Sequence, residues 1–199
     1  MLRVENLATP GLQPCSFRVG RGECVVVQGP SGAGKTVLMR ALADLDPSQG
    51  EIYLLDVART AMTGPQWRRK VGYVPAEPGW WGEVIADHFP DQARAVAVAQ
   101  ELGLSESVFD RAVNQASTGE RLRLALVRAL LTDPLVLLLD EPTAALDPES
   151  TQKTEALIAA RIRQGLSVLW TTHDRAQATR MASRILTVES GLVSDGRAA

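Results

Sequence analysis

Short runs of apolar, often β-branched residues recur along the chain and alternate with longer stretches that have a helical pattern. A short run that is apolar at nearly every position is typical of a strand buried on both faces of a sheet. These runs predict strands at residues 23–28, 51–56, 71–74, 135–139, 167–171 and 185–188. The longer stretches predict helices at residues 36–45, 91–102, 118–131, 149–164 and 175–182.

This alternation predicts an α/β fold with a mostly parallel sheet, because parallel strands are joined by crossovers that are usually helices. Residues 76–116 contain no run of the buried-strand kind, so we expect a small helical subdomain there. The prediction is therefore a single domain over residues 1–199, with its core at about 1–75 and 117–199.

Composition is that of an ordinary globular protein, with 45% hydrophobic and 22% charged residues among 199. The formal net charge is −2, so no basic field attracts nucleic acid, and we expect no nucleic-acid partner. The apolar runs, such as those at 25–27 and 135–139, are far shorter than the ~18 to 20 residues that span a bilayer. We expect a soluble chain without a signal peptide, whose work at a membrane needs a partner that spans it.

A glycine-rich segment lies between the strand predicted at 23–28 and the helix predicted at 36–45. It matches the phosphate-loop pattern GxxxxGK[ST] and consists of Gly29, Pro30, Ser31, Gly32, Ala33, Gly34, Lys35 and Thr36. Its glycines let backbone N–H groups turn toward a phosphate chain, and the helix N-terminus adds partial positive charge. Lys35 is predicted to reach the β- and γ-phosphates, and the Thr36 hydroxyl to hold Mg²⁺. The alternative is a glycine-rich turn with an incidental lysine.

Two carboxylates follow the apolar run at 135–139. Asp140 ends a hydrophobic strand, which suits a carboxylate that holds Mg²⁺ through water. Glu141 comes one residue later and can polarise an attacking water as a general base. The alternative is an acidic strand end that caps the next turn, with Pro142 and Thr143 as turn residues. The phosphate loop elsewhere in the chain favours the catalytic interpretation.

Three further segments, taken together with the phosphate loop, resemble a known family. The Walker B motif and D-loop of ATP-binding-cassette (ABC) ATPases are similar to Asp140–Asp147, DEPTAALD. The signature motif of that family is similar to Ser117–Arg121, STGER, and its switch-histidine segment to Thr171–Asp174, TTHD. The four motifs stand in the family order, and the resemblance covers nearly the whole chain. Residues 168–170 and the short helical subdomain also resemble iron-export ATPases of this family.

The resemblance implies a P-loop NTPase (RecA-like) core with antiparallel β elements near the N-terminus. It implies ATP and Mg²⁺ as cofactors, with Lys35 and Glu141 in catalysis. His173 would bond the γ-phosphate and sense its loss. The alternative is that His173 is an ordinary surface or core histidine. Ser117 and Gly119 would contact the γ-phosphate held by a second subunit.

Ser117 and Glu120 also have a simpler interpretation. Their spacing, S-x-x-E ahead of an apolar helix, is that of a capping box. In the simpler reading the pair only caps the helix. In the functional reading the same helix N-terminus also points outward at a phosphate of the partner chain.

The chain departs from the family pattern at three places. Ala76 stands where the family usually has a glutamine that touches Mg²⁺ and the attacking water, and Glu77 is the nearest polar substitute, a possible Mg²⁺ ligand. Residues 6–13, upstream of the phosphate loop, contain no aromatic residue to stack on adenine, and Phe17 is expected to pack in the core, so Pro10 or Leu12 would give apolar contact instead. Thr118 replaces the usual glycine. None of these changes removes a residue of the predicted catalytic set, so we still expect hydrolysis.

We interpret the chain as the ATP-binding subunit of an ABC transporter, hydrolysing Mg-ATP at an interface between two chains to drive a separate membrane permease. A second ATPase subunit, in a homodimer formed with ATP, is the other expected partner. The expected location is cytoplasmic, peripheral on the inner face of the cell membrane through the permease. Of Trp80 and Trp81, one is expected to pack in the core and the other to line an apolar groove for a permease helix.

Three other functions stay open at this point. A non-transport ABC ATPase has the same motifs but usually carries coiled-coil insertions, zinc modules or a second cassette. A P-loop kinase or GTPase would not need the signature motif, and the guanine-specifying NKxD sequence is absent. A weakly hydrolysing regulatory ABC module stays open because of the altered glutamine and the missing aromatic residue.

Overall fold

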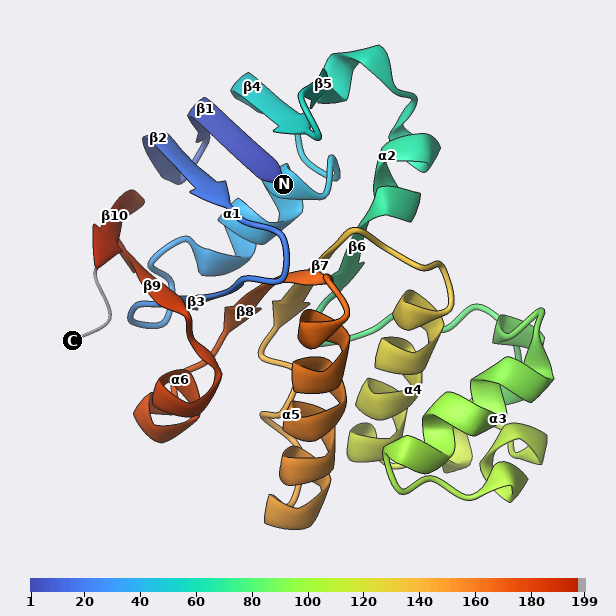
Figure 1. The fold of residues 1–199 in the computed structure, drawn as a ribbon. Helices are drawn as coiled ribbons and strands as arrows, with labels where there is room; N and C mark the ends of the chain where they lie inside the picture. The colour runs from blue at the N-terminus through green and yellow to red at the C-terminus, as the bar shows by residue number, and fades with distance from the viewer. Residues whose placement is uncertain (197–199) are drawn as a thin grey trace.

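The computed structural model describes residues 1–196 and follows the predicted alternation of strands and helices (Figure 1). The strands are β1 (Leu2–Thr9), β2 (Leu12–Val19), β3 (Cys24–Gln28), β4 (Gln49–Leu54), β5 (Val57–Ala58), β6 (Val71–Val74), β7 (Val136–Asp140), β8 (Ser167–Thr171), β9 (Arg184–Glu189) and β10 (Leu192–Gly196). The α-helices are α1 (Lys35–Leu42), α2 (Gly64–Lys70), α3 (Gln92–Glu101), α4 (Thr118–Leu130), α5 (Pro148–Arg163) and α6 (Arg175–Met181). Short 3₁₀ helices cover Arg59–Ala61, Ile85–His88, Glu106–Asp110 and Val113–Gln115.

Two sheets form the framework. The larger has the order β10-β9-β3-β8-β7-β6, and every neighbouring pair from β9 to β6 is parallel. Strand β10 closes one edge and runs antiparallel to β9. The smaller sheet, with the order β2-β1-β4-β5, is antiparallel throughout. The predicted α/β fold, with a mostly parallel sheet and antiparallel strands near the N-terminus, is therefore confirmed.

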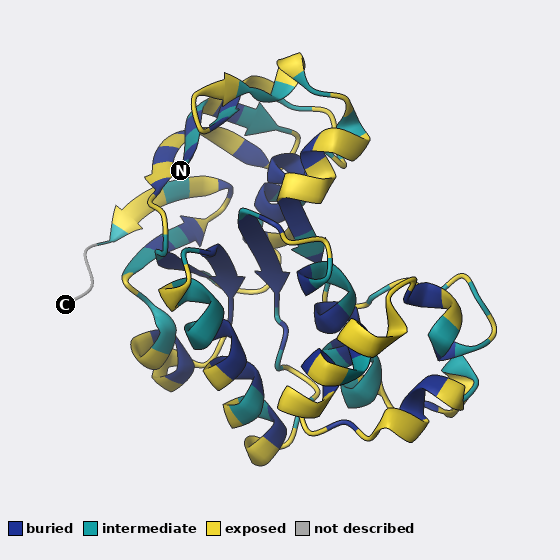
Figure 2. Cartoon of the chain, turned by 45° about the vertical axis from the view of Figure 1, so that its right-hand side comes forward, coloured by how far each residue is buried: buried dark blue, intermediate teal, exposed yellow. Residues whose placement is uncertain are grey.

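The apolar runs that predicted strands are the buried centre of the molecule. All residues of β7 and β8 are buried, and Figure 2 shows the central strands as a dark blue layer between helices whose outer faces are exposed. Successive side chains of a strand point to opposite faces. Leu137 and Leu139 accordingly pack into one hydrophobic core, whereas Val136 and Leu138 pack into another. A strand with a core on each face is therefore apolar at most of its positions.

The two cores have different partners. The first lies between the parallel sheet and the helices α3, α4 and α5, and includes Trp170 and the edge-on pair Phe89 and Phe109. The second joins the two sheets through α1, whose Leu38 and Met39 are completely buried. In Figure 1 helices α3 and α4 lie on one side of the parallel sheet, away from β1, β2 and β4. Within residues 1–196, none of the helices has the length and apolar character that a membrane crossing requires.

Some element boundaries differ from the prediction. The strand predicted at 51–56 ends at Leu54, because Leu55 and Asp56 have φ values of 50° and 63° and form the tight turn that leads into β5. Two consecutive left-handed residues are typical of the type I′ hairpin turn. The helix predicted at 36–45 ends at Leu42, ahead of the left-handed Asp44. Helix α2 was not predicted, although its capping box of Thr63 and Gln66 was a usable signal.

Candidate functional site

The phosphate loop joins β3 to α1 at the end of the parallel sheet. Its last residue, Gly34, has a φ of 112° and precedes α1, which begins with no side-chain cap. An uncapped helix start leaves backbone N–H groups that can bind an anion. The loop also runs close to β9: a Cβ built on Gly29 would lie 2.1 Å from the carbonyl oxygen of Val188. Only glycine fits there, so the loop pattern in the sequence has a steric reason at this position.

Lys35 is the first residue of α1 and is only 7% exposed. Its Nζ donates hydrogen bonds to the carbonyl oxygens of Gly29 at 2.8 Å and Pro30 at 3.1 Å. The side chain therefore bends back over its own loop and places the ammonium group beside the turned backbone. A buried ammonium group needs such acceptors, and it can equally donate to phosphate oxygens.

Asp140 is held by three hydroxyl groups. Its Oδ2 accepts from Thr36 Oγ1 at 2.7 Å and from Tyr73 Oη at 3.2 Å, and its Oδ1 accepts from Thr171 Oγ1 at 2.8 Å. Burial, together with the nearby Asp140 carboxylate, raises the pKa of Tyr73, which keeps this side chain a hydroxyl donor. Asp140 and Thr36 were predicted as site residues from the sequence, whereas the contacts of Tyr73 and Thr171 with Asp140 were not, because these two residues lie on the strands that flank β7.

Glu141 has an unusual backbone and an orphaned carboxylate oxygen. Its φ of 51° is left-handed, and its backbone N–H donates to Thr171 Oγ1 at 2.8 Å. Its Oε1 lies 2.9 Å from His173 Nε2, yet no donor among residues 1–196 reaches this buried oxygen in hydrogen-bond geometry. Burial raises the pKa of Glu141, while His173 and Lys35 oppose that shift. A carboxylate with a free acceptor position can take a proton from a water molecule.

Lys35, Asp140 and Glu141 line one cavity of about 270 Å³. It lies at the carboxyl ends of the adjacent strands β3, β8 and β7, where open α/β sheets bind ligands. Its walls are formed by Gly11, Ser31, Gly32, Gly34, Lys35, Thr36, Val37, Asp140, Glu141 and His173. The structure thus brings together side chains that stand more than a hundred positions apart in the sequence.

Comparison with known proteins places this site in a family. The family model described as ABC transporter matches residues 12–144. The chain belongs to the ABC transporter family. It is 33% identical to the phosphonates import ATP-binding protein PhnC of Trichormus variabilis, over 96% of this chain and 86% of that protein. It is 35% identical to the Nod factor export ATP-binding protein I of Bradyrhizobium diazoefficiens, over 92% of this chain and 64% of that protein.

Solved structures agree with the fold. An ATP-binding subunit of an ABC transporter superposes with a TM-score of 0.89 at 25% identity, covering 98% of this chain and 89% of that chain. A dimeric ATP-binding cassette in a post-hydrolysis state, bound to ADP and Pi, superposes with a TM-score of 0.88 at 24% identity. That alignment covers 99% of this chain and 98% of that chain. The chain is the ATP-binding subunit of an ABC transporter and an ATPase, which excludes the kinase and GTPase alternatives.

The signature segment of this ABC ATPase forms the predicted cap. Ser117 Oγ accepts from the backbone N–H of Glu120 at 3.1 Å, and the Ser117 N–H donates to Glu120 Oε2 at 2.7 Å. A Cβ on Gly119 would lie 3.1 Å from the Ala145 carbonyl oxygen, so the start of α4 packs on the D-loop. Neither Ser117 nor Gly119 lines the cavity around the phosphate loop of its own chain.

The three departures from the family pattern have different positions in the structure. Ala76 and Glu77 are exposed, and neither lines the phosphate-loop cavity. Leu12 is buried in the second core, so of the two residues expected to contact adenine only Pro10 is exposed. Thr118 is the first residue of α4 and is exposed.

Trp80 and Trp81 differ as the sequence analysis expected. Trp80 packs against the first core, whereas Trp81 is 74% exposed. The Arg128 guanidinium lies over both rings, 4.8 and 4.7 Å from their centroids. Both rings also meet His88 edge-on, so the exposed indole is held in a fixed position.

Proposed function

We propose that this ABC ATPase hydrolyses Mg-ATP at a site shared by two chains and thereby drives a separate membrane permease. Lys35 neutralises the β- and γ-phosphates, and the backbone of the phosphate loop binds them. Thr36 and Asp140 hold Mg²⁺. Glu141 accepts a proton from the attacking water, and His173 binds the γ-phosphate and senses its loss. The chain lies on the cytoplasmic side of the cell membrane, attached through the permease.

One observation carries this proposal. An ammonium group, a hydroxyl, two carboxylates and an imidazole converge on one cavity beside the phosphate loop, from Lys35, Thr36, Asp140, Glu141 and His173. Phosphoryl transfer needs little covalent chemistry from a protein, and depends on positioning and on charge stabilisation. This set supplies positive charge for the phosphates, oxygen ligands for a metal and one acceptor for a proton.

The residues present fit Mg²⁺. Thr36 Oγ1 and Asp140 Oδ2 are 2.7 Å apart, so a hydroxyl and a carboxylate oxygen already face the same point. Mg²⁺ prefers oxygen ligands and is usually held by one or two protein groups together with substrate phosphates and water. When bound, the ion would neutralise charge that develops on the phosphates. Tyr73 and Thr171 keep the Asp140 carboxylate in place from behind.

The position of the signature segment supports a site made by two chains. Ser117 and Gly119 lie outside the cavity of their own chain, at the N-terminus of the thirteen-residue helix α4. The start of a helix carries partial positive charge and stabilises an anion. In a dimer, this end of α4 faces the γ-phosphate bound by the partner.

Ser117→Asp distinguishes this role from simple capping. Aspartate caps a helix as well as serine does, so the free energy of unfolding should stay within ~0.5 kcal/mol of the parent. The added negative charge would face the partner's γ-phosphate and should reduce ATP turnover at least roughly tenfold. Steady-state ATPase assays and urea unfolding measure the two quantities. Ser105→Asp makes the same change at another cap and should leave turnover unchanged.

Mixing two inactive variants tests the shared site directly. Lys35→Ala damages the phosphate loop and Ser117→Asp damages the signature segment. In a mixed dimer both defects fall in one site, and the other site is intact. Turnover should therefore reappear on mixing. If Ser117→Asp keeps full turnover, or if mixing restores none, the site is not composite.

Trp81 is the proposed contact for a permease helix. The isolated chain exposes this indole on the surface of the segment between β6 and α4, with Arg128 stacked on it and His88 behind it. Exposed aromatic side chains that are fixed by their neighbours are typical of the centre of protein interfaces. Of the two tryptophans, Trp81 is therefore the one that we propose contacts the partner.

Glu77 is the proposed substitute for the missing loop glutamine. It is exposed, and it reaches the metal only if the segment from Pro75 to Pro78 turns inward. Glu77→Ala is expected to raise the Mg²⁺ concentration at half-maximal ATP turnover, because a carboxylate ligand to the metal or its water is lost. Ala76→Gln is expected to lower it by supplying the amide. Turnover is measured across a series of Mg²⁺ concentrations.

Glu83→Ala is the matched control for Glu77→Ala, because Glu83 is an exposed glutamate on the same segment. It should change neither the rate nor the Mg²⁺ dependence. A Glu77→Ala protein that behaves like this control would show that Glu77 does not act at the metal. The loop would then couple to the permease without touching the metal.

A further inference from the structure

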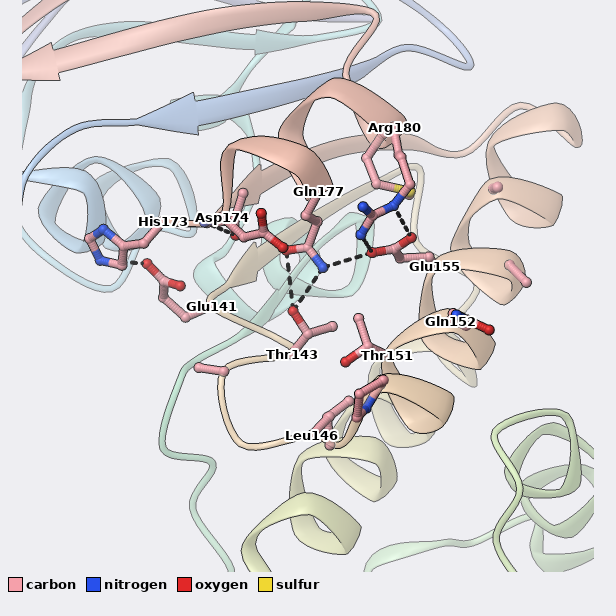
Figure 3. Close-up of a pocket in the computed structure, with 16 residues that line it drawn as sticks. Glu141, Thr143, Leu146, Thr151, Gln152, Glu155, His173, Asp174, Gln177 and Arg180 are labelled. Carbon is pink, nitrogen blue, oxygen red and sulfur yellow. Dashed lines mark hydrogen bonds and ion pairs between the residues drawn. The ribbon is translucent and has the colours of Figure 1, made fainter.

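A row of hydrogen-bonded polar side chains, with buried Gln177 at its centre, lies beside Glu141 and His173 (Figure 3). Thr143 follows Glu141 in the loop after β7, and Gln177 is the third residue of α6, which follows His173. Figure 3 shows the row continuing from Gln177 to Glu155 of α5. Gln177 is only 2% exposed, so its amide has to find all its partners within the protein.

The partners of Gln177 determine which way its amide points. Trp170 Nε1 can only donate, and it lies 3.2 Å from Gln177 Oε1. The Glu155 carboxylate can only accept, and its Oε1 lies 2.9 Å from Gln177 Nε2. The Thr143 hydroxyl lies between the two ends, 3.0 Å from Nε2 and 3.2 Å from Oε1. If the amide were flipped, its NH₂ group would face the Trp170 N–H, and its oxygen would face the Glu155 carboxylate. Only one orientation of the amide therefore satisfies the site.

The far end of the row is an ion pair. Arg180 donates to both oxygens of Glu155, from Nη2 at 2.7 Å and from Nε at 3.0 Å. The hydrogen bonds from Arg180 hold the pKa of Glu155 below its usual range, so Glu155 stays an acceptor for Gln177. Two residues of α6, Gln177 and Arg180, are in this way attached to one carboxylate of α5.

The row attaches α6 to the loop after β7 and to α5. This helix has seven residues, of which only Gln177 and Ala178 are buried. Ala178 of α6 lies in the first core and Met181 packs against it, and the polar contacts of the row add a second link between α6 and the rest of the protein. Because His173 precedes α6 and Glu141 precedes Thr143 in the loop after β7, the same amide joins the segments that carry both side chains.

We propose that Gln177 is a positioning residue, which through Thr143 holds the loop of Glu141 in register with the helix that follows His173. The inference rests on the proposed roles of Glu141 and His173. It adds a residue that touches neither nucleotide nor metal. This residue acts by fixing the distance between Glu141 and His173. Displacing a reacting group by a fraction of an ångström lowers the rate of the chemical step, whereas the phosphate loop continues to bind ATP.

Thr143→Val and Thr143→Ser test the link with little disturbance, because Thr143 lies in a partly exposed loop. Valine has the shape of threonine without the hydroxyl, and serine keeps the hydroxyl. The valine variant should lower kcat for ATP roughly threefold to tenfold, which is the worth of about one hydrogen bond, with KM unchanged. The serine variant should restore kcat. Steady-state ATPase assays measure kcat and KM for each variant in the full 199-residue chain.

Gln177→Leu removes the centre of the row and should lower kcat by at least as much. In the double variant with Thr143→Val, the loss should be no larger than in Gln177→Leu alone, because both changes break the same contact. Thr154→Val is the matched control: its buried hydroxyl donates only to the Ser150 carbonyl within α5, at 2.9 Å, and kcat should not change.

The outcomes separate this inference from the proposed function. Parent kcat in folded Thr143→Val and Gln177→Leu proteins would overturn the positioning role, and so would losses that add fully in the double variant. A reduced kcat that serine does not restore would also overturn it, because bulk packing would then be the cause. Full turnover in Glu141→Gln would instead contradict the proposed function, whatever the Thr143 variants do.

Discussion

Replacing Lys35 with alanine is expected to abolish ATP turnover. The Nζ group is the cation that the phosphate loop holds against the Gly29 and Pro30 carbonyls, beside the cavity. Alanine removes the charge that would neutralise the β- and γ-phosphates in the transition state. Losing one such electrostatic contact typically costs about 3 to 4 kcal/mol, or a hundredfold to a thousandfold in rate. Steady-state ATPase assays and nucleotide-binding titrations measure the loss.

Lys153→Ala is the control for this experiment. Lys153 lies on α5 and pairs with Glu149 one turn earlier, with 2.6 Å between Nζ and Oε1. An exposed pair of this kind contributes little, so both turnover and stability should stay close to those of the parent. Turnover near the parent rate in the Lys35→Ala protein would contradict the assignment of the phosphate loop.

Glu141→Gln is expected to bind ATP but barely hydrolyse it, and to accumulate as an ATP-bound dimer. The amide has the shape of the carboxylate but cannot accept a proton from the attacking water. Loss of general-base catalysis typically lowers a rate by about a hundredfold to ten-thousandfold. Because hydrolysis is what reopens the proposed dimer, blocking it traps the closed state.

Size-exclusion chromatography with and without Mg-ATP measures the dimer, and ATPase assays measure the rate. Glu149→Gln makes the same chemical change at an exposed position of α5, outside the cavity, and should leave both unchanged. A Glu141→Gln protein that stays monomeric with Mg-ATP would argue against the site shared by two chains. Equal turnover would argue against Glu141 as the base.

The central part of the fold could be predicted from local patterns. Every position of β7 and β8 is apolar or carries a small group satisfied within the protein, because helices cover one face of the sheet and a second sheet with α1 covers the other. That requirement leaves a direct trace in the sequence. The hairpin of β4 and β5 was harder to predict from the sequence, because its turn residues, Leu55 and Asp56, are not the glycine or asparagine that usually marks such a turn.

The residues at the phosphates were predictable for a similar reason. A loop that turns backbone N–H groups toward an anion needs glycines at particular steps; at Gly29, for example, a Cβ would lie 2.1 Å from the carbonyl oxygen of Val188. Asp140 and Glu141 stand at the end of a strand, and Lys35 and Thr36 at the start of a helix, that the pattern had already located. The role of Glu77 could not be predicted in this way. Glu77 was chosen only as the nearest polar residue to Ala76, and it is exposed in the structure.

The sequence by itself determined the α/β class, the phosphate loop, the acidic pair and the capping box, because each depends on residues close together in the chain. Only the tertiary structure decided that Thr171 lies beside Asp140, since the register of β7 on β8 sets that pair. The same holds for Tyr73 and for the contact of Gln177 with Thr143, thirty-four residues apart. Hydrogen bonds between distant elements depend on how those elements pack, and no local pattern encodes that arrangement.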